Sequence, residues 1–191
     1  MARALGYRLL DRDGAALCGL PETLDRTVRI DAAMAHQDLP QAQVTALCDV
    51  PARVQDAAER LAIPQAFGDY RELLRSRDVD VVHITSPNRF HAEMSLAALK
   101  AGKHVICEKP MALTVAQADE MIELARRQDR LVVANLMQRY NPLYDAVAGL
   151  IRSKVLGEAL HGHFENEASD ENLPPDHWFW DRETSGGIFV E

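Results

Sequence analysis

The sequence predicts an α/β protein with a doubly wound parallel sheet, followed by the beginning of a second α+β domain. Two observations support this prediction. From Val44 onward, short apolar runs alternate with stretches whose apolar residues recur at helical spacing. After Asn135 the pattern changes to residue-by-residue alternation. Regular alternation of strand and helix implies right-handed crossovers, and therefore parallel strands with helices on both faces.

The first elements are expected between residues 28 and 61. Val28-Arg-Ile30 has the character of a strand start, and Val44 to Cys48 forms a second apolar run that ends at an aspartate. A helix is predicted over residues 53–61, where apolar residues recur at helical spacing and Pro51 lies near the first turn.

The next units follow the same order. Residues 79–85 are predicted to form a strand, and Ser86-Pro-Asn88 turns the chain into a helix from about Phe90 to Ala101. Gly102 supplies the C-terminal cap of that helix. The following strand begins at His104 and breaks at Pro110.

Thr114-Val-Ala-Gln117 is a capping box that predicts the start of a further helix, because a hydroxyl accepts an orphan N–H and Gln stands three residues later. A strand is expected at residues 131–134 and a helix at residues 142–153. The run Ala159 to Glu165 alternates, which is typical of a half-exposed antiparallel strand.

These elements imply three segments. Residues 1–27 receive no element, and disorder is one interpretation of them. Residues 28–134 form a nucleotide-binding domain, and residues 135–191 form the start of a truncated second domain. The last segment is short for an independent core.

The composition excludes several classes of protein. The formal net charge of −8 argues against nucleic-acid or anionic-membrane partners. No apolar run approaches the ~18 residues that span a bilayer, and the N-terminus carries no signal-peptide pattern. We expect a soluble cytoplasmic protein whose cysteines, Cys18, Cys48 and Cys107, are reduced core thiols.

Three polar clusters fall where predicted parallel strands end: Asp49, Ser86-Pro-Asn88 and Glu108-Lys-Pro110. Ligands of open α/β sheets bind at this edge. Asp49 stands where a carboxylate accepts hydrogen bonds from a ribose diol. Its alternative role is to cap the helix that follows.

Four motifs carry a resemblance to a known family: residues 101–113 (AGKHVICEKPMAL), residues 86–91 (SPNRFH), residues 138–142 (QRYNP) and residues 185–187 (SGG). The chain resembles the Gfo/Idh/MocA oxidoreductases from about Val44 to Glu191. The resemblance implies a Rossmann domain followed by a domain with an open, mostly antiparallel sheet that forms homo-oligomers in the family. It also implies hydride transfer between NAD(P) and the hydroxyl of a small sugar or polyol.

The resemblance assigns roles to individual residues. Lys109 is implied to be catalytic, beside the nicotinamide and the reacting hydroxyl. Asp49 would hold the adenosine ribose, which favours NAD over NADP, although Arg53 nearby could accommodate a phosphate. The other residues implied to bind the cofactor are Ser86, Pro87, Asn88, His91, Glu108, Lys109 itself and Trp178.

Some of these residues keep an alternative role. His91 could instead pack at the start of its helix, and Trp178 could be a packing residue. Phe179 stands where the family more often has arginine. His161 and His163 lack a nearby ligand set, so we expect no metal site.

Two departures from the family leave a second interpretation open. Residues 31–40 contain no glycine, so the phosphate-binding loop loses its physical basis. Glu191 occupies the family's acidic position, and the proton-transfer histidine expected after it is not in this sequence. The alternative to an oxidoreductase is therefore a catalytically inactive, truncated remnant that binds at most a nucleotide or a partner chain.

Overall fold

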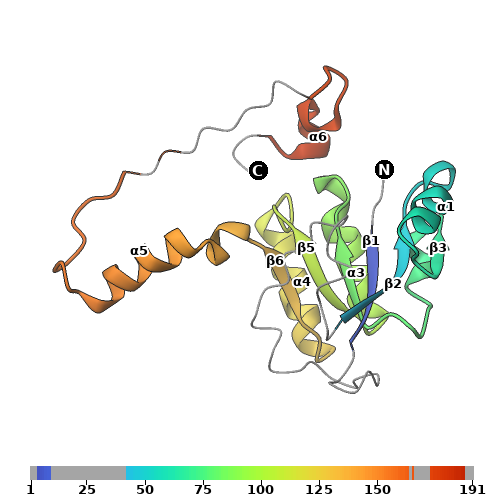
Figure 1. The fold of residues 1–191 in the computed structure, drawn as a ribbon, viewed down its shortest axis with the longest axis horizontal. Coiled ribbons are helices and arrows are strands. Elements are labelled where there is room, and N and C mark those ends of the chain that lie inside the picture. The colour runs from blue at the N-terminus through green and yellow to red at the C-terminus, as the bar shows by residue number, and fades with distance from the viewer. Residues whose placement is uncertain (1–3, 10–41, 164, 166–172, 188–191) are drawn as a thin grey trace. The chain divides into compact units, whose positions relative to one another are not determined.

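The computed structural model describes residues 4–9, 42–163, 165 and 173–187 of the chain (Figure 1). The chain divides into two compact units. The first contains the sheet and joins the chain up to Asn135 with the segment from Trp178 onward. The second unit is Leu136–His177.

The first unit contains a six-stranded sheet in the order β3-β2-β1-β4-β5-β6. Three neighbouring pairs, β2 with β3, β4 with β5 and β5 with β6, run parallel. The predicted parallel α/β architecture is confirmed for these strands. Their bounds, with that of β1, are β1 Ala4–Leu9, β2 Ala42–Cys48, β3 Gln65–Phe67, β4 Val81–Ile84, β5 His104–Glu108 and β6 Val132–Asn135.

Strand β1 is a correction to the sequence-based prediction, which assigned no element to residues 1–27. It lies between β2 and β4 and runs antiparallel to both. Ala4 pairs with Cys48 on one side and with Ile84 on the other, so β1 starts at the edge where its neighbours end. The sheet is therefore mixed, and residues 28–30 lie outside the described part of the chain.

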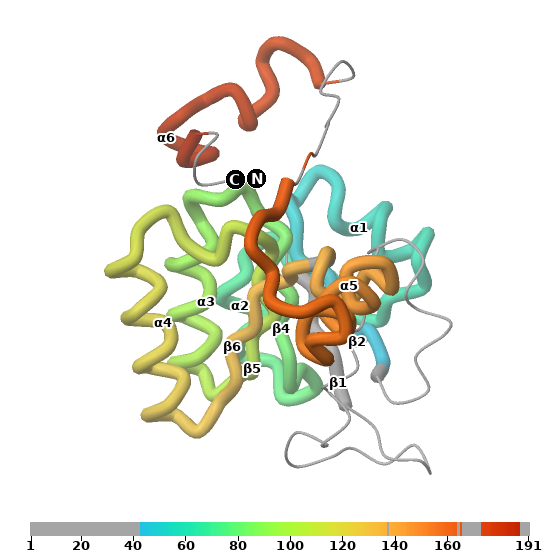
Figure 2. The backbone as a smooth tube through the Cα atoms, turned by 90° about the vertical axis from the view of Figure 1, so that its left-hand side faces the viewer, coloured from blue at the N-terminus to red at the C-terminus, as the bar shows by residue number. Residues whose placement is uncertain are grey.

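Helices cover both faces of the sheet, as expected. Figure 2 shows α3 and α4 on one side of the strands and α1 on the other. One apolar cluster contains buried side chains of α3 (Met94, Ala98, Leu99) and of α4 (Leu124, Ala125) together with residues of β4 and β5, and the buried residues of α1 lie outside it. The helices of this unit are α1 Pro51–Arg60, α2 Tyr70–Leu73, α3 His91–Lys100, α4 Val115–Arg127 and α6 Arg182–Ser185, with short 3-10 turns at Asn88–Phe90 and Trp178–Trp180.

Two predicted helix-end signals, the capping box at Thr114 and the glycine after α3, are confirmed. The Thr114 hydroxyl accepts the N–H of Gln117, and the Gln117 side chain accepts the N–H of Thr114 at 3.2 Å, which completes the capping box of α4. Gly102 follows α3 with a φ of +75°, a conformation that glycine adopts without strain.

The core of the sheet unit is apolar and closely packed. Leu73, Ile84 and Leu99 are completely buried. Cys48 and Cys107 are buried free thiols, and burial raises the pKa of each to about 12. The thiolate is the reactive form of cysteine, so these two side chains act as small apolar groups, as expected.

In the second unit the predicted helix over residues 142–153 is confirmed, and the predicted strand is not. Helix α5, Pro142–Ser153, contains no buried residue. Residues 159–163 and 165 form no strand, and Leu160 is 93% exposed. The prediction of a strand over 159–165 is wrong, because alternation alone does not form a strand without a neighbour to pair with. Among the described helices, none is long and apolar enough to span a bilayer.

Candidate functional site

The three polar clusters lie at the carboxyl ends of parallel strands, as predicted. Asp49 directly follows β2, Ser86 follows β4, and Glu108 is the last residue of β5. The ends of β4 and β5 are adjacent, because Ile84 pairs with Cys107. The structure therefore brings the second and third clusters together at one edge of the sheet.

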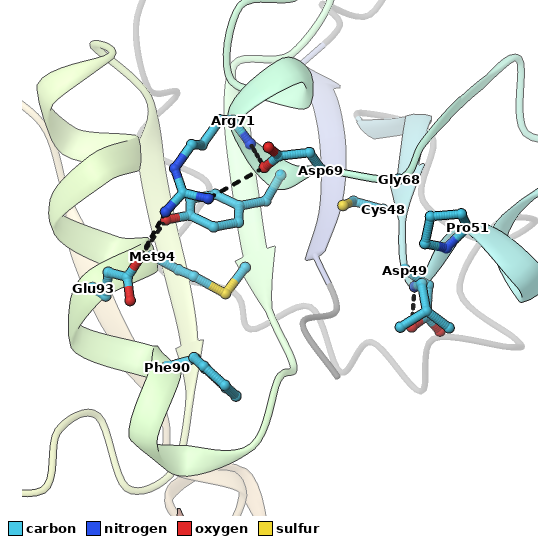
Figure 3. Close-up of a pocket in the computed structure, with 11 residues that line it drawn as sticks. Cys48, Asp49, Pro51, Gly68, Asp69, Arg71, Phe90, Glu93 and Met94 are labelled. Carbon is cyan, nitrogen blue, oxygen red and sulfur yellow. Dashed lines mark hydrogen bonds and ion pairs between the residues drawn. The ribbon is translucent and has the colours of Figure 1, made fainter.

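A pocket of about 420 Å³ lies at this edge, beside the end of β2 (Figure 3). One wall comes from the turn between β2 and α1, and the opposite wall from the first turn of α3. Gly68 allows close packing in the first wall, since a Cβ there would lie 2.9 Å from Cγ of Pro51. The pocket is lined by Cys48, Asp49, Val50, Pro51, Gly68, Asp69, Tyr70, Arg71, Phe90, Glu93 and Met94.

Asp49 lies in the wall of the pocket, as Figure 3 shows. Its Oδ1 accepts the backbone N–H of Val50 at 2.8 Å. The N-cap position of α1 is Val50, and no side chain caps that helix. The structure therefore does not support the alternative role of Asp49 as a helix cap.

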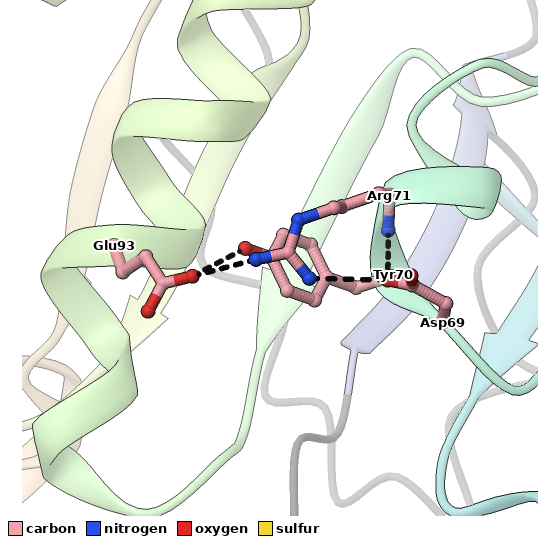
Figure 4. A network of polar contacts seen from close by, with 4 residues as sticks. All are labelled: Asp69, Tyr70, Arg71 and Glu93. Atoms are coloured by element: carbon pink, nitrogen blue, oxygen red, sulfur yellow. Dashed lines mark hydrogen bonds and ion pairs between the residues drawn. The ribbon is translucent and has the colours of Figure 1, made fainter.

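A polar network that the sequence-based prediction missed joins α2 to α3 across the pocket (Figure 4). The Tyr70 hydroxyl donates to Oε1 of Glu93 at 2.8 Å, and Arg71 donates to the same oxygen at 3.0 Å. Arg71 also pairs with Asp69 at 3.5 Å. Burial, reinforced by the Glu93 carboxylate, raises the pKa of Tyr70 to about 12. The sequence position of Asp69, Tyr70 and Arg71, just after the short strand β3, was the signal that could have marked them as site residues.

His91 connects the two loops that follow β4 and β5. Its Nε2 lies 2.7 Å from the carbonyl oxygen of Ser86, and its Nδ1 lies 2.6 Å from that of Pro110. The ring is 1% exposed. Both nitrogens are thereby engaged, which favours the alternative role of His91 at the start of the helix over direct contact with a cofactor.

Ser86, Pro87 and Asn88 form the buried turn between β4 and α3. The Ser86 hydroxyl is a buried polar group for which the described part of the chain provides no hydrogen-bond partner. Pro87 takes the N-cap position of the 3-10 turn. This turn therefore offers one buried hydroxyl at the strand-end edge.

Asn88 brings a distant segment to this edge. Its side-chain amide donates to the carbonyl oxygen of Ser185 at 2.7 Å, and 97 positions separate the two residues. Trp178 belongs to the same segment and is half-buried, with an edge-on contact to Phe179 at 6.2 Å between ring centroids. The segment that contains Trp178 and the Ser185-Gly-Gly187 motif therefore belongs to the first unit, which contains the sheet.

Glu108 and Lys109 end β5 in different environments. Oε1 of Glu108 accepts the Asn135 amide at 2.6 Å and lies 3.3 Å from Nε2 of His83, which is 1% exposed. Lys109 directly follows the carboxyl end of β5 and is exposed. The sequence-based prediction did not include His83 or Asn135, since each lies on a different strand from Glu108.

The contacts of Glu108 shift its acid-base behaviour. Partial burial acts to raise its pKa, but the hydrogen bonds with His83 and Asn135 outweigh burial and hold the pKa below its ordinary value of 4.5. A carboxyl whose pKa is depressed by folding stabilises the native state above the unfolded-state pKa. That contribution is lost as the pH falls through the folded-state pKa.

Glu108→Gln is therefore expected to remove part of the acid-dependent loss of stability. The wild-type chain should lose stability as the pH falls below the ordinary value of 4.5, and the Gln variant should lose less over the same interval. Urea unfolding at a series of pH values measures this difference. Glu123→Gln, on the exposed face of α4, is the matched control and should follow the wild type. Parallel curves for all three proteins would contradict the assignment.

No cluster of three or more potential metal-binding side chains occurs among the described residues. His161 and His163 are exposed, and His163 pairs with Glu165 at 3.9 Å. His177 belongs to the same unit and is partly buried.

The comparisons with known proteins agree with this geometry. Residues 16–136 match the family described as "Oxidoreductase family, NAD-binding Rossmann fold", the Gfo/Idh/MocA model. Inositol 2-dehydrogenase of Salmonella typhimurium strain LT2 is 38% identical over 132 residues, which is 66% of this chain and 39% of the relative. The chain thus spans about two fifths of that relative's length.

Solved structures give the same result. The crystal structure of an NAD binding oxidoreductase from Klebsiella pneumoniae is 40% identical, with a TM-score of 0.59, over 66% of this chain and 34% of that one. A levoglucosan dehydrogenase in complex with NADH and levoglucosan is 29% identical, with a TM-score of 0.56, over 59% of this chain and 31% of that one.

Proposed function

Since this chain belongs to the Gfo/Idh/MocA oxidoreductases with an NAD-binding Rossmann fold, we propose that it binds an NAD-type dinucleotide at the carboxyl edge of its sheet. The proposed reaction is hydride transfer between that cofactor and a hydroxyl of a small sugar or polyol, as the name of its inositol 2-dehydrogenase relative suggests. The proposed location is the cytoplasm.

The observation that carries this proposal is the pocket beside Asp49. Its volume of about 420 Å³ lies within the usual range for small-molecule sites, about 300–1,000 Å³. A carboxylate at the carboxyl end of a parallel strand is the group that accepts hydrogen bonds from a ribose diol. The residues present therefore fit the adenosine half of the cofactor.

The charges around the pocket favour NAD over NADP. Asp49, Asp69 and Glu93 contribute carboxylates, and Arg71 is already paired with the last two. A 2′-phosphate would meet a net negative environment here, whereas a ribose diol donates hydrogen bonds to carboxylates. This arrangement supports NAD as the preferred cofactor.

Lys109 is the proposed proton-transfer residue. It is exposed at the end of β5, and Glu108 beside it is held by hydrogen bonds to neighbouring strands. NAD supplies the hydride acceptor in such reactions. The Lys109 amine would hydrogen-bond the substrate hydroxyl and accept or return its proton. Trp178 and Ser86 are proposed to border the cofactor at the carboxyl ends of the same parallel strands.

Asp49→Asn is expected to weaken NAD⁺ binding about 10- to 100-fold, because a hydrogen bond to a charged group contributes about 1.5–3 kcal/mol. Isothermal titration calorimetry with NAD⁺ and NADP⁺ measures the change, and the wild type should prefer NAD⁺. Asp56→Asn on the exposed side of α1 is the matched control and should bind as the wild type does. Equal affinity of all three proteins for NAD⁺ would overturn the assignment of the pocket.

The direction of β1 favours a second candidate function, a catalytically inactive nucleotide-binding chain. A Rossmann phosphate loop follows the carboxyl end of the first strand. Here β1 is antiparallel, and its carboxyl end Leu9 pairs with Ala42, at the opposite edge from Asp49. Such a chain would bind adenosine compounds without turnover. An assay of NAD⁺ reduction with myo-inositol distinguishes the two candidates, since turnover excludes the second.

A further inference from the structure

Residues 178–187 join the sheet unit from a distant part of the chain. The chain leaves this unit at Leu136 and returns to it at Trp178, so residues 178–187 are termed the return segment. Helix α6 of this segment packs against the 3-10 turn Asn88–Phe90, which leads from β4 into α3. The return segment therefore meets the sheet unit at the edge where the cofactor is proposed to bind.

A buried hydrogen bond holds the return segment to this turn. The side-chain amide of Asn88 donates to the carbonyl oxygen of Ser185 at 2.7 Å, and the two residues are 3% and 2% exposed. Water cannot replace the amide while the segment is docked. A chain without this donor would either leave a buried carbonyl oxygen without it or release the segment, which returns that oxygen to water.

A charge contact at the same junction is weaker. Arg89, next to Asn88, acts electrostatically on Asp181, the N-cap residue of α6. The pKa of Asp181 lies below its ordinary value of 3.8, first because Thr184 donates a hydrogen bond to its carboxylate and to a smaller extent because of Arg89. Asp181 is exposed, and exposed charge pairs stabilise little. Of these two contacts, the hydrogen bond of Asn88 is therefore the one expected to hold the segment.

The return segment is shaped by contacts within itself. The Asp181 carboxylate accepts the backbone N–H of Glu183 at 3.1 Å and so caps α6. Three aromatic rings make successive edge-on contacts, with centroid distances of 6.2 and 5.3 Å, in the order Trp178, Phe179 and Trp180. Loss of the contact with the turn is therefore expected to release the segment as a unit, and the sheet should stay folded.

We propose that Asn88 is a positioning residue that docks the return segment at the carboxyl edge of the sheet, and that docking and dinucleotide binding favour each other. The turn with Asn88 follows β4, and Lys109 follows the adjacent strand β5. Docking brings Trp178 to this edge, because its 3-10 turn packs against α6. A dinucleotide that contacts Trp178 binds the docked form more tightly, and such coupling is reciprocal. The coupling rests on the proposed function, whereas the docking does not.

The first test uses tryptophan fluorescence of the ligand-free chain. Trp178 and Trp180 are the two tryptophans of the sequence, so the emission reports on the return segment alone. In Asn88→Leu, the emission maximum should shift to longer wavelength, and quenching by acrylamide should rise towards that of the urea-unfolded chain. Glu183→Gln, at an exposed position of α6, is the matched control and should behave as the wild type does.

Far-UV circular dichroism establishes that the sheet unit of each variant is folded. If Asn88→Leu is folded and its tryptophans are quenched as in the wild type, the proposal is overturned. Asn88→Ala removes the same amide with a smaller side chain and repeats the comparison if Asn88→Leu does not fold. If neither variant folds, Asn88 is required for the fold itself, which also overturns the proposal.

The second test measures the coupling by isothermal titration calorimetry with NAD⁺ and AMP. Asn88→Leu is expected to bind NAD⁺ about tenfold more weakly, a usual size for coupling between two binding events. AMP occupies only the pocket proposed for adenosine beside Asp49, so its affinity should stay within about twofold of wild type. In the wild type, NAD⁺ should also protect the tryptophans from acrylamide more than AMP does.

The outcomes separate this proposal from the proposed function. Equal losses of NAD⁺ and AMP affinity in Asn88→Leu would show general damage to the site and would overturn the coupling. So would an unchanged NAD⁺ affinity in a variant whose return segment is released. If neither ligand binds the wild-type chain, the proposed function fails, and the quenching of the ligand-free chain still decides whether Asn88 docks the segment.

Discussion

Lys109→Ala is expected to lower the rate of NAD⁺-dependent polyol oxidation by about 10²- to 10⁴-fold, the usual contribution of a positioned acid-base group. The side chain is exposed at the end of β5 and lies in the loop that His91 holds through Pro110. Removing the amine takes away the group that would exchange a proton with the substrate hydroxyl. Steady-state kinetics at saturating NAD⁺ measures the change in kcat.

The matched control for this prediction is Lys100→Ala. Lys100 is exposed in the last turn of α3, one helix length from the first turn that lines the pocket. Its replacement should leave kcat within about twofold of wild type. A Lys109→Ala variant that turns over as fast as the control would rule out a role for Lys109 in proton transfer. The affinity for NAD⁺ should change little in Lys100→Ala.

Leu99→Ala is expected to lower the free energy of unfolding by about 2–5 kcal/mol, because truncation of a buried leucine loses its transfer free energy and leaves a cavity. Leu99 is completely buried in the cluster that joins α3 and α4 to the sheet. The site lies at the other end of α3, so this variant also tests how far the pocket depends on the core. Urea unfolding followed by circular dichroism gives the difference in free energy.

Leu160→Ala makes the same chemical change at a side chain that is 93% exposed. Its free energy of unfolding should stay within about 0.5 kcal/mol of wild type, as is usual for surface positions. Similar values for the two variants would mean that α3 does not pack on the sheet as described. The pair therefore tests the packing of the fold separately from any ligand.

Much of the fold follows from local sequence patterns. The strands from β4 to β6 and helices α3 and α4 were predicted within a few residues, because their apolar periodicity and end signals are local properties of the chain. The capping box at Thr114 is an example, since both of its hydrogen bonds join residues three apart. The alternation of apolar and polar residues over 159–165 was misleading, because a strand also requires a neighbouring strand with which to form hydrogen bonds.

The candidate site was predicted in part. Sequence order alone placed Asp49, Ser86 and Lys109 at strand ends, since parallel strands share one carboxyl edge. It could not identify which side chains hold that edge together. His83, Glu108 and Asn135 come from three strands and meet because of the register of the sheet.

The sequence by itself determined the α/β class, the order of the parallel units and the edge at which polar residues gather, because these depend on periodicity and chain direction. The tertiary structure alone decided that β1 runs antiparallel, that His91 faces two carbonyl oxygens, and that Asn88 reaches Ser185 across 97 positions. Contacts of this kind depend on which distant backbone groups remain unpaired after the sheet has formed, and no local pattern encodes that.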